Sequence, residues 1–206
     1  MRILIIGSNG LLGNDLVAGW ASDNIIPATS RDADIRDIAQ VRKLVMQARP
    51  GWIILAAGYT DVDGSERNPE LAFAVNRDGA RNVSVVAREH DAKLCYLSTD
   101  YVFDGSATRP YEPADPVHPL NVYGASKAAG EEAVKEHAGH WLIVRTSWLF
   151  GASKSCFPEK ILRAADSQPE LRVVHDQFGS PTYTLDLAAA IRELVRADAR
   201  GILNIT

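Results

Sequence analysis

The chain has 206 residues, 46% of them hydrophobic and 23% charged, a composition typical of a globular domain with a sizeable core. Its net charge of −4 and pI near 5.7 provide no basic field for a phosphate polymer, which argues against nucleic acid as a partner. The first apolar run, residues 3–6, is too short for a signal-peptide core or a membrane span, so we expect no membrane partner. Two cysteines without metal-site spacing, Cys95 and Cys156, predict a reducing, cytoplasmic location.

Short aliphatic runs alternate with helical segments along the whole chain. This rhythm predicts an α/β fold, a doubly wound, Rossmann-like parallel sheet with helices on both faces. Ligands then bind beyond the carboxyl ends of the strands. The predicted strands are residues 3–6, 25–28, 52–57, 94–97, 141–144, 171–174 and 202–205.

Helical segments follow most of these runs, and Asn68 and Thr184 are predicted to cap two of them. Pro27 lies in the second strand, which we expect to be internal, so this strand should be short or frayed there. Four prolines without periodicity predict a loop over residues 104–121. The helices are expected to begin near Leu11, Ile38, Pro69, Tyr123, Ser155 and Leu185.

A glycine-rich turn, GSNGLLG at residues 7–13, directly follows the first predicted strand and opens a helix. Gly7 permits a tight turn, Gly10 lets the backbone approach a pyrophosphate, and Gly13 allows close packing of helix on strand. The helix start, with Leu11 and Leu12, offers N–H groups and a positive dipole to phosphate. The sequence therefore predicts a dinucleotide-binding site.

The residues after the second strand bear on the choice of dinucleotide. An acidic residue there favours NAD, whereas an arginine suits the 2′-phosphate of NADP. Here Thr29 and Arg31 favour NADPH, although Asp32 and Asp34 lie near enough to compete for the Arg31 cation. NADH therefore remains an alternative. We expect Asp34 and Ile35 beside the adenine, with Asp34 accepting from its amino group.

A tyrosine and a lysine, Tyr123 and Lys127, are four residues apart and share one face of a predicted helix. The ammonium and an oxidised nicotinamide would favour the phenolate and bring acid–base chemistry toward neutral pH. Thr99, at the end of the fourth strand, can polarise a substrate carbonyl. The small residues near Ala57, Gly58 and Tyr59 let the backbone run beside the cofactor.

Several segments together resemble the dTDP-4-dehydrorhamnose reductase family of extended short-chain dehydrogenases. They are LSTDYVFDG at 97–105, PLNVYGASK at 119–127, AAGYTDVD at 56–63, RTSW at 145–148 and DQFGSPT at 176–182. The resemblance runs from the first strand to the end of the chain. It implies reduction of a 4-keto-6-deoxy sugar nucleotide, dTDP-4-dehydrorhamnose to dTDP-rhamnose.

The resemblance also implies roles for individual residues. Tyr123 is the proton donor with Lys127 as its partner, Thr99 and Asp100 contact the sugar, and Trp148 flanks the substrate. Members of the family have further residues after the strand at 202–205. We therefore expect one cofactor-binding domain over residues 1–206, with elements of a substrate lobe within about 150–206 and the rest of the lobe absent from this chain.

Two other functions stay open. A sugar-nucleotide dehydratase or epimerase with retained NAD needs a further acid–base carboxylate, but Asp100 is followed by Tyr101. A non-catalytic, cofactor-binding regulatory subunit is disfavoured by the intact Tyr123 and Lys127. A homodimer is also left open.

The remaining polar residues give weaker signals. The five histidines share no helix face and no ligand spacing, so we expect no metal site. Glu131 and Glu132, with Lys135 and Glu136, are interpreted as the solvated side of the Tyr123 helix.

Overall fold

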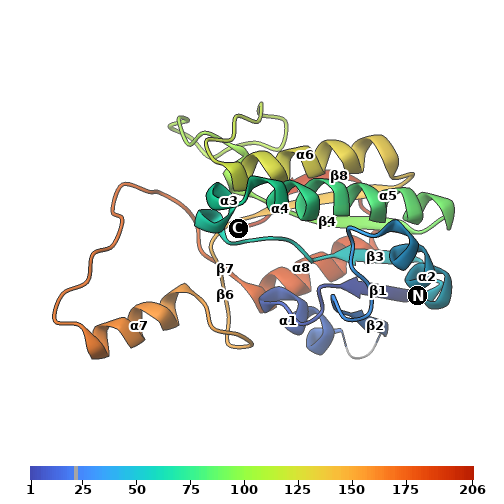
Figure 1. The fold of residues 1–206 in the computed structure, drawn as a ribbon, viewed down its shortest axis with the longest axis horizontal. Helices are drawn as coiled ribbons and strands as arrows, with labels where there is room; N and C mark the ends of the chain where they lie inside the picture. Colours follow the sequence, from blue (N-terminus) through green and yellow to red (C-terminus); the bar gives the residue numbers. More distant parts are fainter. Residues whose placement is uncertain (21–22) are drawn as a thin grey trace.

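The computed structural model describes residues 1–20 and 23–206, and within them six parallel strands form one sheet (Figure 1). The spatial order is β2-β1-β3-β4-β5-β8. The strands are β1 (Arg2–Ile6), β2 (Asn24–Ala28), β3 (Trp52–Leu55), β4 (Lys93–Thr99), β5 (Trp141–Thr146) and β8 (Gly201–Asn204). The doubly wound parallel sheet expected from the sequence is thus confirmed.

Helices cover both faces of this sheet. One apolar cluster packs α1 and α8 against one face, and a second packs α2, α5 and α6 against the other. None of the described helices is long and apolar enough to cross a membrane. The helices are α1 (Leu11–Gly19), α2 (Ile38–Ala48), α3 (Val62–Arg67), α4 (Pro69–Phe73), the π-helix η1 (Ala74–Gly79), α5 (Ala80–Glu89), the 3₁₀-helix η2 (Asp100–Val102), α6 (Val122–His137), α7 (Phe157–Ser167) and α8 (Thr184–Arg196).

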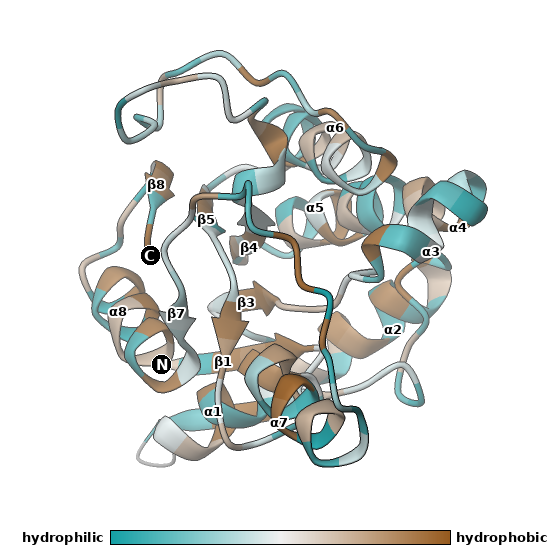
Figure 2. Ribbon diagram, turned by 90° about the vertical axis from the view of Figure 1, so that its left-hand side faces the viewer, coloured by the Kyte–Doolittle hydropathy of each residue, from teal (hydrophilic) through white to brown (hydrophobic). Residues whose placement is uncertain are grey.

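The strands are apolar on both sides because both faces are covered. Leu4 and Ile6 of β1 lie in the cluster beneath α2 and α5, whereas Ile3 and Ile5 lie in the cluster beneath α1 and α8. Figure 2 shows β1 and β3 as hydrophobic ribbons at the centre of the molecule, between the helices. Burial from both sides explains why these strands read as continuous apolar runs.

The strand order places a topological switch point at β1. The chain leaves β1 through α1 to reach β2 on one side, then returns through α2 to β3 on the other. Connections that diverge in this way leave a crevice at the carboxyl ends of β1 and β3. The fold therefore predicts where a ligand binds before any side chain is considered.

The helix ends show which local signals decided the boundaries. Asn68 caps α4 as predicted, its side chain accepting from the N–H of Leu71. The predicted cap at Thr184 is wrong, since α8 begins at Thr184 and its hydroxyl instead donates to Asp15 and to the carbonyl of Phe150. A buried carboxylate on the neighbouring helix α1 thus competes successfully for that hydroxyl.

Two strand predictions need correction. In the described part of the chain β2 pairs only with β1, so it is an edge strand and not internal; Pro27 lies within it, where a missing ladder donor is tolerated. Residues 171–174 form no strand, because they run through solvent with Val173 and Val174 exposed and no neighbouring strand to pair with. Aliphatic content alone does not make a strand without a partner.

The segment between β5 and α8 lies apart from the sheet. Its two short strands, β6 (Leu149–Phe150) and β7 (Thr182–Tyr183), pair with each other, and α7 projects away from the body between them (Figure 1). No residue of α7 is buried, and Phe157 and Leu162 are exposed. Helix α8 packs on the main sheet and β8 is one of its strands. Of the C-terminal region expected to contribute to a substrate lobe, only residues 149–183 therefore lie outside the main body.

Candidate active site

The glycine-rich turn lies at the switch point, directly after the carboxyl end of β1. Gly7 has a positive φ of 92°, and a Cβ there would overlap the backbone of Ala56 and Ala57 after β3. A Cβ on Gly13 would overlap the carbonyl of Gly7. Both positions therefore require glycine: Gly7 for its conformation and its close approach, Gly13 for the packing of α1 on the turn.

The start of α1 offers backbone groups for an anion. Gly10 is the N-cap and provides no side-chain bond, so the first N–H groups of the helix keep free hydrogen-bonding capacity. Leu12 is buried in the core, so it can contribute only its backbone, while the side chain of Leu11 is half-buried. This cradle of backbone donors, narrowed by residues without side chains, fits the pyrophosphate of a dinucleotide.

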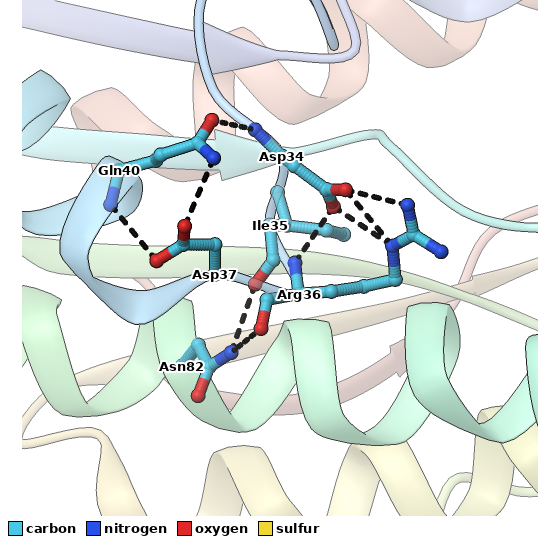
Figure 3. A network of polar contacts seen from close by, with 6 residues as sticks. All are labelled: Asp34, Ile35, Arg36, Asp37, Gln40 and Asn82. Atoms are coloured by element: carbon cyan, nitrogen blue, oxygen red, sulfur yellow. Dashed lines mark hydrogen bonds and ion pairs between the residues drawn. The ribbon is translucent and has the colours of Figure 1, made fainter.

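The loop after β2 contains a network of polar contacts (Figure 3). Arg36 binds the carboxylate of Asp34 through Nε and Nη2, at 2.9 and 2.5 Å, and these hydrogen bonds hold the pKa of Asp34 below its usual value. Ile35 between them is buried in the core against Gly79. Asp34 thus reaches the predicted adenine region with its oxygens already engaged by a neighbour.

Arg31 stands outside that network. Its N–H donates to the hydroxyl of Thr29, and the Asp32 carboxylate accepts from the N–H and hydroxyl of Thr29. Asp32 and Asp34 were expected to compete for the Arg31 cation, and the structure does not show this. Asp32 is bound to Thr29, and Asp34 is bound to Arg36, a second arginine on the same loop.

The backbone after β3 is fixed by a residue that sequence reasoning missed. Asn76 accepts from the N–H of Tyr59 at 2.9 Å and donates to the Tyr59 carbonyl at 3.0 Å and to the Ser126 hydroxyl at 2.9 Å. It sits on the π-helix η1, whose irregular turn no simple periodicity reveals. Ala57, Gly58 and Tyr59 are thereby tied to α6, and a Cβ on Gly58 would crowd the Asn76 side chain.

Helix α6 brings Tyr123 to the end of β4. Asn121 caps the helix through the N–H of Gly124, which has no Cβ to overlap the Tyr101 carbonyl. The Tyr123 ring meets the Tyr101 ring edge-on, with centroids 5.6 Å apart. Burial raises the pKa of Tyr123 to about 12, although a hydrogen bond with Thr99 opposes that shift. The structure thus unites Tyr123 and Thr99, predicted from separate segments.

Lys127 lies deeper in the protein than a helix lysine usually does. Its Nζ donates to the carbonyl of Leu97 at 2.5 Å and lies 4.0 Å from the centroid of the Tyr96 ring. Burial lowers the pKa of Lys127 to about 7, although the charge of Glu131 opposes that shift. Burial is the largest influence on the pKa of Tyr123 in this structure, and the joint effect of Lys127 and an oxidised nicotinamide stays a prediction.

Glu131 was expected to face solvent, and this is wrong. Its carboxylate is buried and accepts from Arg145 and from the hydroxyl of Ser98. The signal that could have revealed it is its position four residues after Lys127, on the same helix face. Glu132, by contrast, is exposed and pairs with Lys135.

Of the three residues that the resemblance assigns to the substrate, Thr99 ends β4, Asp100 follows it, and Trp148 follows β5. Thr99 donates to the Asp100 carboxylate at 3.0 Å, and burial raises the pKa of Asp100. Trp148 has a positive φ of 46°, rare for an aromatic residue, and its exposed ring lies against Gly179.

Over residues 1–20 and 23–206, no group of three or more histidine, cysteine or acidic side chains is placed to hold a metal ion.

Comparison with known proteins adds an independent line of evidence. The family model described as RmlD substrate binding domain matches residues 1–204. A dTDP-4-keto-6-deoxy-D-glucose reductase of Streptomyces niveus is 40% identical, over 100% of this chain and 72% of that protein. A dTDP-4-dehydrorhamnose reductase of Mycobacterium tuberculosis is 39% identical, over 97% of this chain and 67% of that protein.

Solved structures agree. The crystal structure of dTDP-4-dehydrorhamnose reductase from Bacillus anthracis in complex with NADP matches with a TM-score of 0.95 and 41% identity, covering 100% of this chain and 74% of that one. The UDP-glucose 4-epimerase of Thermus thermophilus in complex with NAD matches with a TM-score of 0.85 and 22% identity, a likeness of fold alone.

Proposed function

The chain belongs to the RmlD substrate-binding-domain family, and from this membership we propose that it reduces the keto group of a 4-keto-6-deoxy sugar nucleotide with NADPH. The proposed substrate is dTDP-4-dehydrorhamnose and the product dTDP-rhamnose. The observation that carries the proposal is the meeting of Tyr123 and Thr99 at the end of β4, beside a buried Lys127. The relatives with reductase names support the same reaction.

The cofactor end of the crevice fits a dinucleotide. The backbone at Gly7, Gly10 and Gly13 would hold its pyrophosphate, and Arg31 would meet the 2′-phosphate that distinguishes NADPH. NADH is the alternative. When bound, the reduced nicotinamide supplies a hydride to the keto carbon. The B. anthracis reductase in complex with NADP supports the choice of NADPH.

The residues of the chain supply the proton and the orientation. Tyr123 donates its phenolic proton to the oxygen of the reduced carbonyl, and a pKa near 12 keeps that proton in place at neutral pH. Thr99 donates a hydrogen bond to the substrate carbonyl and polarises it. Lys127 would hold the ribose hydroxyls of the nicotinamide and would return a proton to Tyr123 after its donation.

Asp100 and Trp148 are proposed to hold the sugar. Both follow strands that end at the same edge of the sheet as Thr99, and the Trp148 ring is exposed there. The left-handed backbone at Trp148 is the kind of local strain that proteins retain at ligand sites. An aromatic ring beside a sugar offers an apolar face to its C–H groups.

The dehydratase or epimerase alternative is less well supported by the geometry. Where a second acid would stand after Asp100, Tyr101 packs on the ring of Tyr123. A regulatory subunit has no need of a phenol, a hydroxyl and a buried lysine in one place. A reducing, cytoplasmic location belongs to the same proposal and is supported by Cys95 and Cys156, which are both free.

The test is Tyr123→Phe in the complete natural polypeptide, with NADPH and a 4-keto-6-deoxy sugar nucleotide. The variant keeps the ring and loses the proton donor, so turnover should fall by about 10²–10⁴ while NADPH affinity stays nearly unchanged. Tyr101→Phe, which removes a hydroxyl from the neighbouring ring, is the control and should keep most of its rate. Full activity in Tyr123→Phe would mean that Tyr123 is not the proton donor, whereas a parent protein that binds NADPH without turnover would favour the regulatory-subunit alternative.

A further inference from the structure

A buried ion pair lies directly beneath the proposed acid–base residues. Glu131 of α6 accepts from Arg145 of β5 at 2.9 Å through Nε and at 2.7 Å through Nη2. The Glu131 side chain is 1% exposed and the Arg145 side chain 3%. Removing two charges from water costs desolvation free energy that their attraction only partly offsets. A gain in stability is therefore a weak explanation for an ion pair at this position.

The contacts of Glu131 lead to both neighbouring catalytic groups. Glu131 Oε1 also accepts from the hydroxyl of Ser98 at 2.5 Å. Ser98 stands between Leu97, whose carbonyl binds the Nζ of Lys127, and Thr99. One carboxylate thus binds the residue that stands in β4 between Leu97, the partner of Lys127, and Thr99.

The charges around Lys127 point the same way. Glu131 follows it by four residues on α6, and its negative charge favours the protonated amine, against the burial that disfavours it. The three buried groups Lys127, Glu131 and Arg145 carry a net charge of about +1. Without the carboxylate, two cations would share the interior with nothing to balance them.

The other charged groups on the elements around α6 have partners other than Glu131. Asp100 of η2 lies beside Thr99 and acts on Tyr123, and Glu66 of α3 accepts from the N–H of Val122 at the start of the helix. The Arg77–Asp78 pair of η1 borders an outer groove that includes Glu132. Tyr96, against which Nζ lies, is a phenol whose pKa burial raises.

We propose that Glu131 is a positioning residue of the acid–base centre: its carboxylate lies one helical turn from the buried Lys127 and, through Ser98, holds the end of β4 in register with Tyr123. The proposal rests on the reductase function proposed above. Glu131 does not touch substrate or cofactor. It acts through Lys127 and Ser98, so its loss should change the pH dependence of the reaction as well as its rate.

The first experiment measures the ionisation of Lys127 without any ligand. In cofactor-free protein carrying ¹³C-labelled lysine, the pH midpoint of the Lys127 Cε signal, assigned with Lys127→Met, should fall in Glu131→Gln by about one pH unit. Glu132→Gln is the matched control, because it removes the adjacent, exposed carboxylate; its midpoint should equal that of the parent. An unchanged midpoint in Glu131→Gln would overturn the proposal, whatever reaction the protein catalyses.

The second experiment follows kcat/KM for keto-sugar reduction against pH in the complete polypeptide. A protonated Lys127 is needed, so activity falls as pH rises through its pKa, and a lower pKa moves that fall to lower pH. Glu131→Gln should therefore lose nearly tenfold around pH 8 and only about twofold around pH 6. A loss equal at every pH would mean that Glu131 only supports the fold. Inactive parent and Glu132→Gln proteins would count against the reductase function, not against the lysine measurement.

A second variant guards against misfolding of Glu131→Gln. Glu131→Gln/Arg145→Gln removes both charges together and leaves no buried ion unpaired. Because Arg145 is a cation, its removal offsets part of the loss of the Glu131 charge, so the lysine midpoint should fall by less than in Glu131→Gln. A double-variant midpoint below that of Glu131→Gln would contradict the proposal, because the fall would then not come from the charge of Glu131.

Discussion

Two ion pairs with the same chemistry occupy opposite environments in this molecule. Arg145 and Glu131 meet under α6 with side chains that are 3% and 1% exposed, whereas Arg36 and Asp34 meet on the loop after β2 with side chains that are 49% and 35% exposed. In both, an arginine binds both oxygens of a carboxylate. The contrast teaches that the proposed acid–base centre is held by buried charge, whereas the loop proposed to receive the adenine is held by exposed charge.

The two environments suit the two tasks. A proton donor and its lysine need fixed positions and a shielded medium, in which charges act strongly on one another. A loop that receives a cofactor must exchange its own contacts for those of the ligand, which is easier where water can replace them. We therefore expect changes near α6 to alter chemistry and stability, and changes on the loop to alter binding.

The largest effect is predicted for Arg145→Met, measured against Arg36→Met. Removing Arg145 leaves the Glu131 carboxylate buried without its partner, so the free energy of unfolding should fall by about 3–5 kcal/mol. The same change at Arg36 should cost about 1 kcal/mol or less, since its pair is exposed to water. Urea unfolding of both variants at one pH measures the difference, and similar losses in the two would remove the contrast.

The sequence predicts much of this fold because its signals are local. Continuous apolar runs predicted β1 and β3, and the glycines at 7, 10 and 13 placed the turn from β1 into α1. The wrong predictions share one cause: each depended on whether a residue or strand distant in sequence lies beside the segment in the folded protein. Glu131 is buried because Arg145 meets it, and residues 171–174 stay irregular because no strand lies beside them.

Residues of the site were predicted unevenly for the same reason. Tyr123 and Lys127 were found by their spacing on one helix, which is a local pattern. Asn76 was missed because its partners, Tyr59 and Ser126, meet it only in the folded protein and its π-helix follows no simple period. The sequence also did not predict which arginine of the loop pairs with Asp34. In the folded loop its partner is Arg36.

The next effect in size concerns Lys127→Met, which should lower turnover and raise stability. Loss of the ammonium should reduce kcat/KM by about 10²–10³ and weaken NADPH binding. A folded-state pKa near 7, below the usual 10.5, means that the unfolded chain holds a proton more readily, so parent stability rises with pH between those values. Lys127→Met lacks this rise. Its stability advantage should be greatest at or below pH 7 and vanish near pH 10.5.

Thermal unfolding of parent and variant across that range measures the stability part of this prediction. Lys135→Met, on the exposed side of the same helix, is the control and should show no advantage that depends on pH in this way. A parental rate and pH profile in Lys127→Met would mean that this lysine takes no part in the reaction.

The smallest effect is expected at Arg31, on the exposed side of the comparison. Arg31→Ala should weaken NADPH binding by about 1.5–3 kcal/mol, or more than tenfold, because it removes one charge-assisted contact to the 2′-phosphate, and should leave NADH binding nearly unchanged. Arg36→Ala is the matched control: that guanidinium is already bound by Asp34, so its loss should not discriminate between the two cofactors. Fluorescence titration of each variant with both cofactors measures the ratio. Equal weakening by Arg31→Ala would remove the preference for NADPH, and a selective loss in Arg36→Ala would transfer the 2′-phosphate contact to Arg36 and require its pair with Asp34 to open when the cofactor binds.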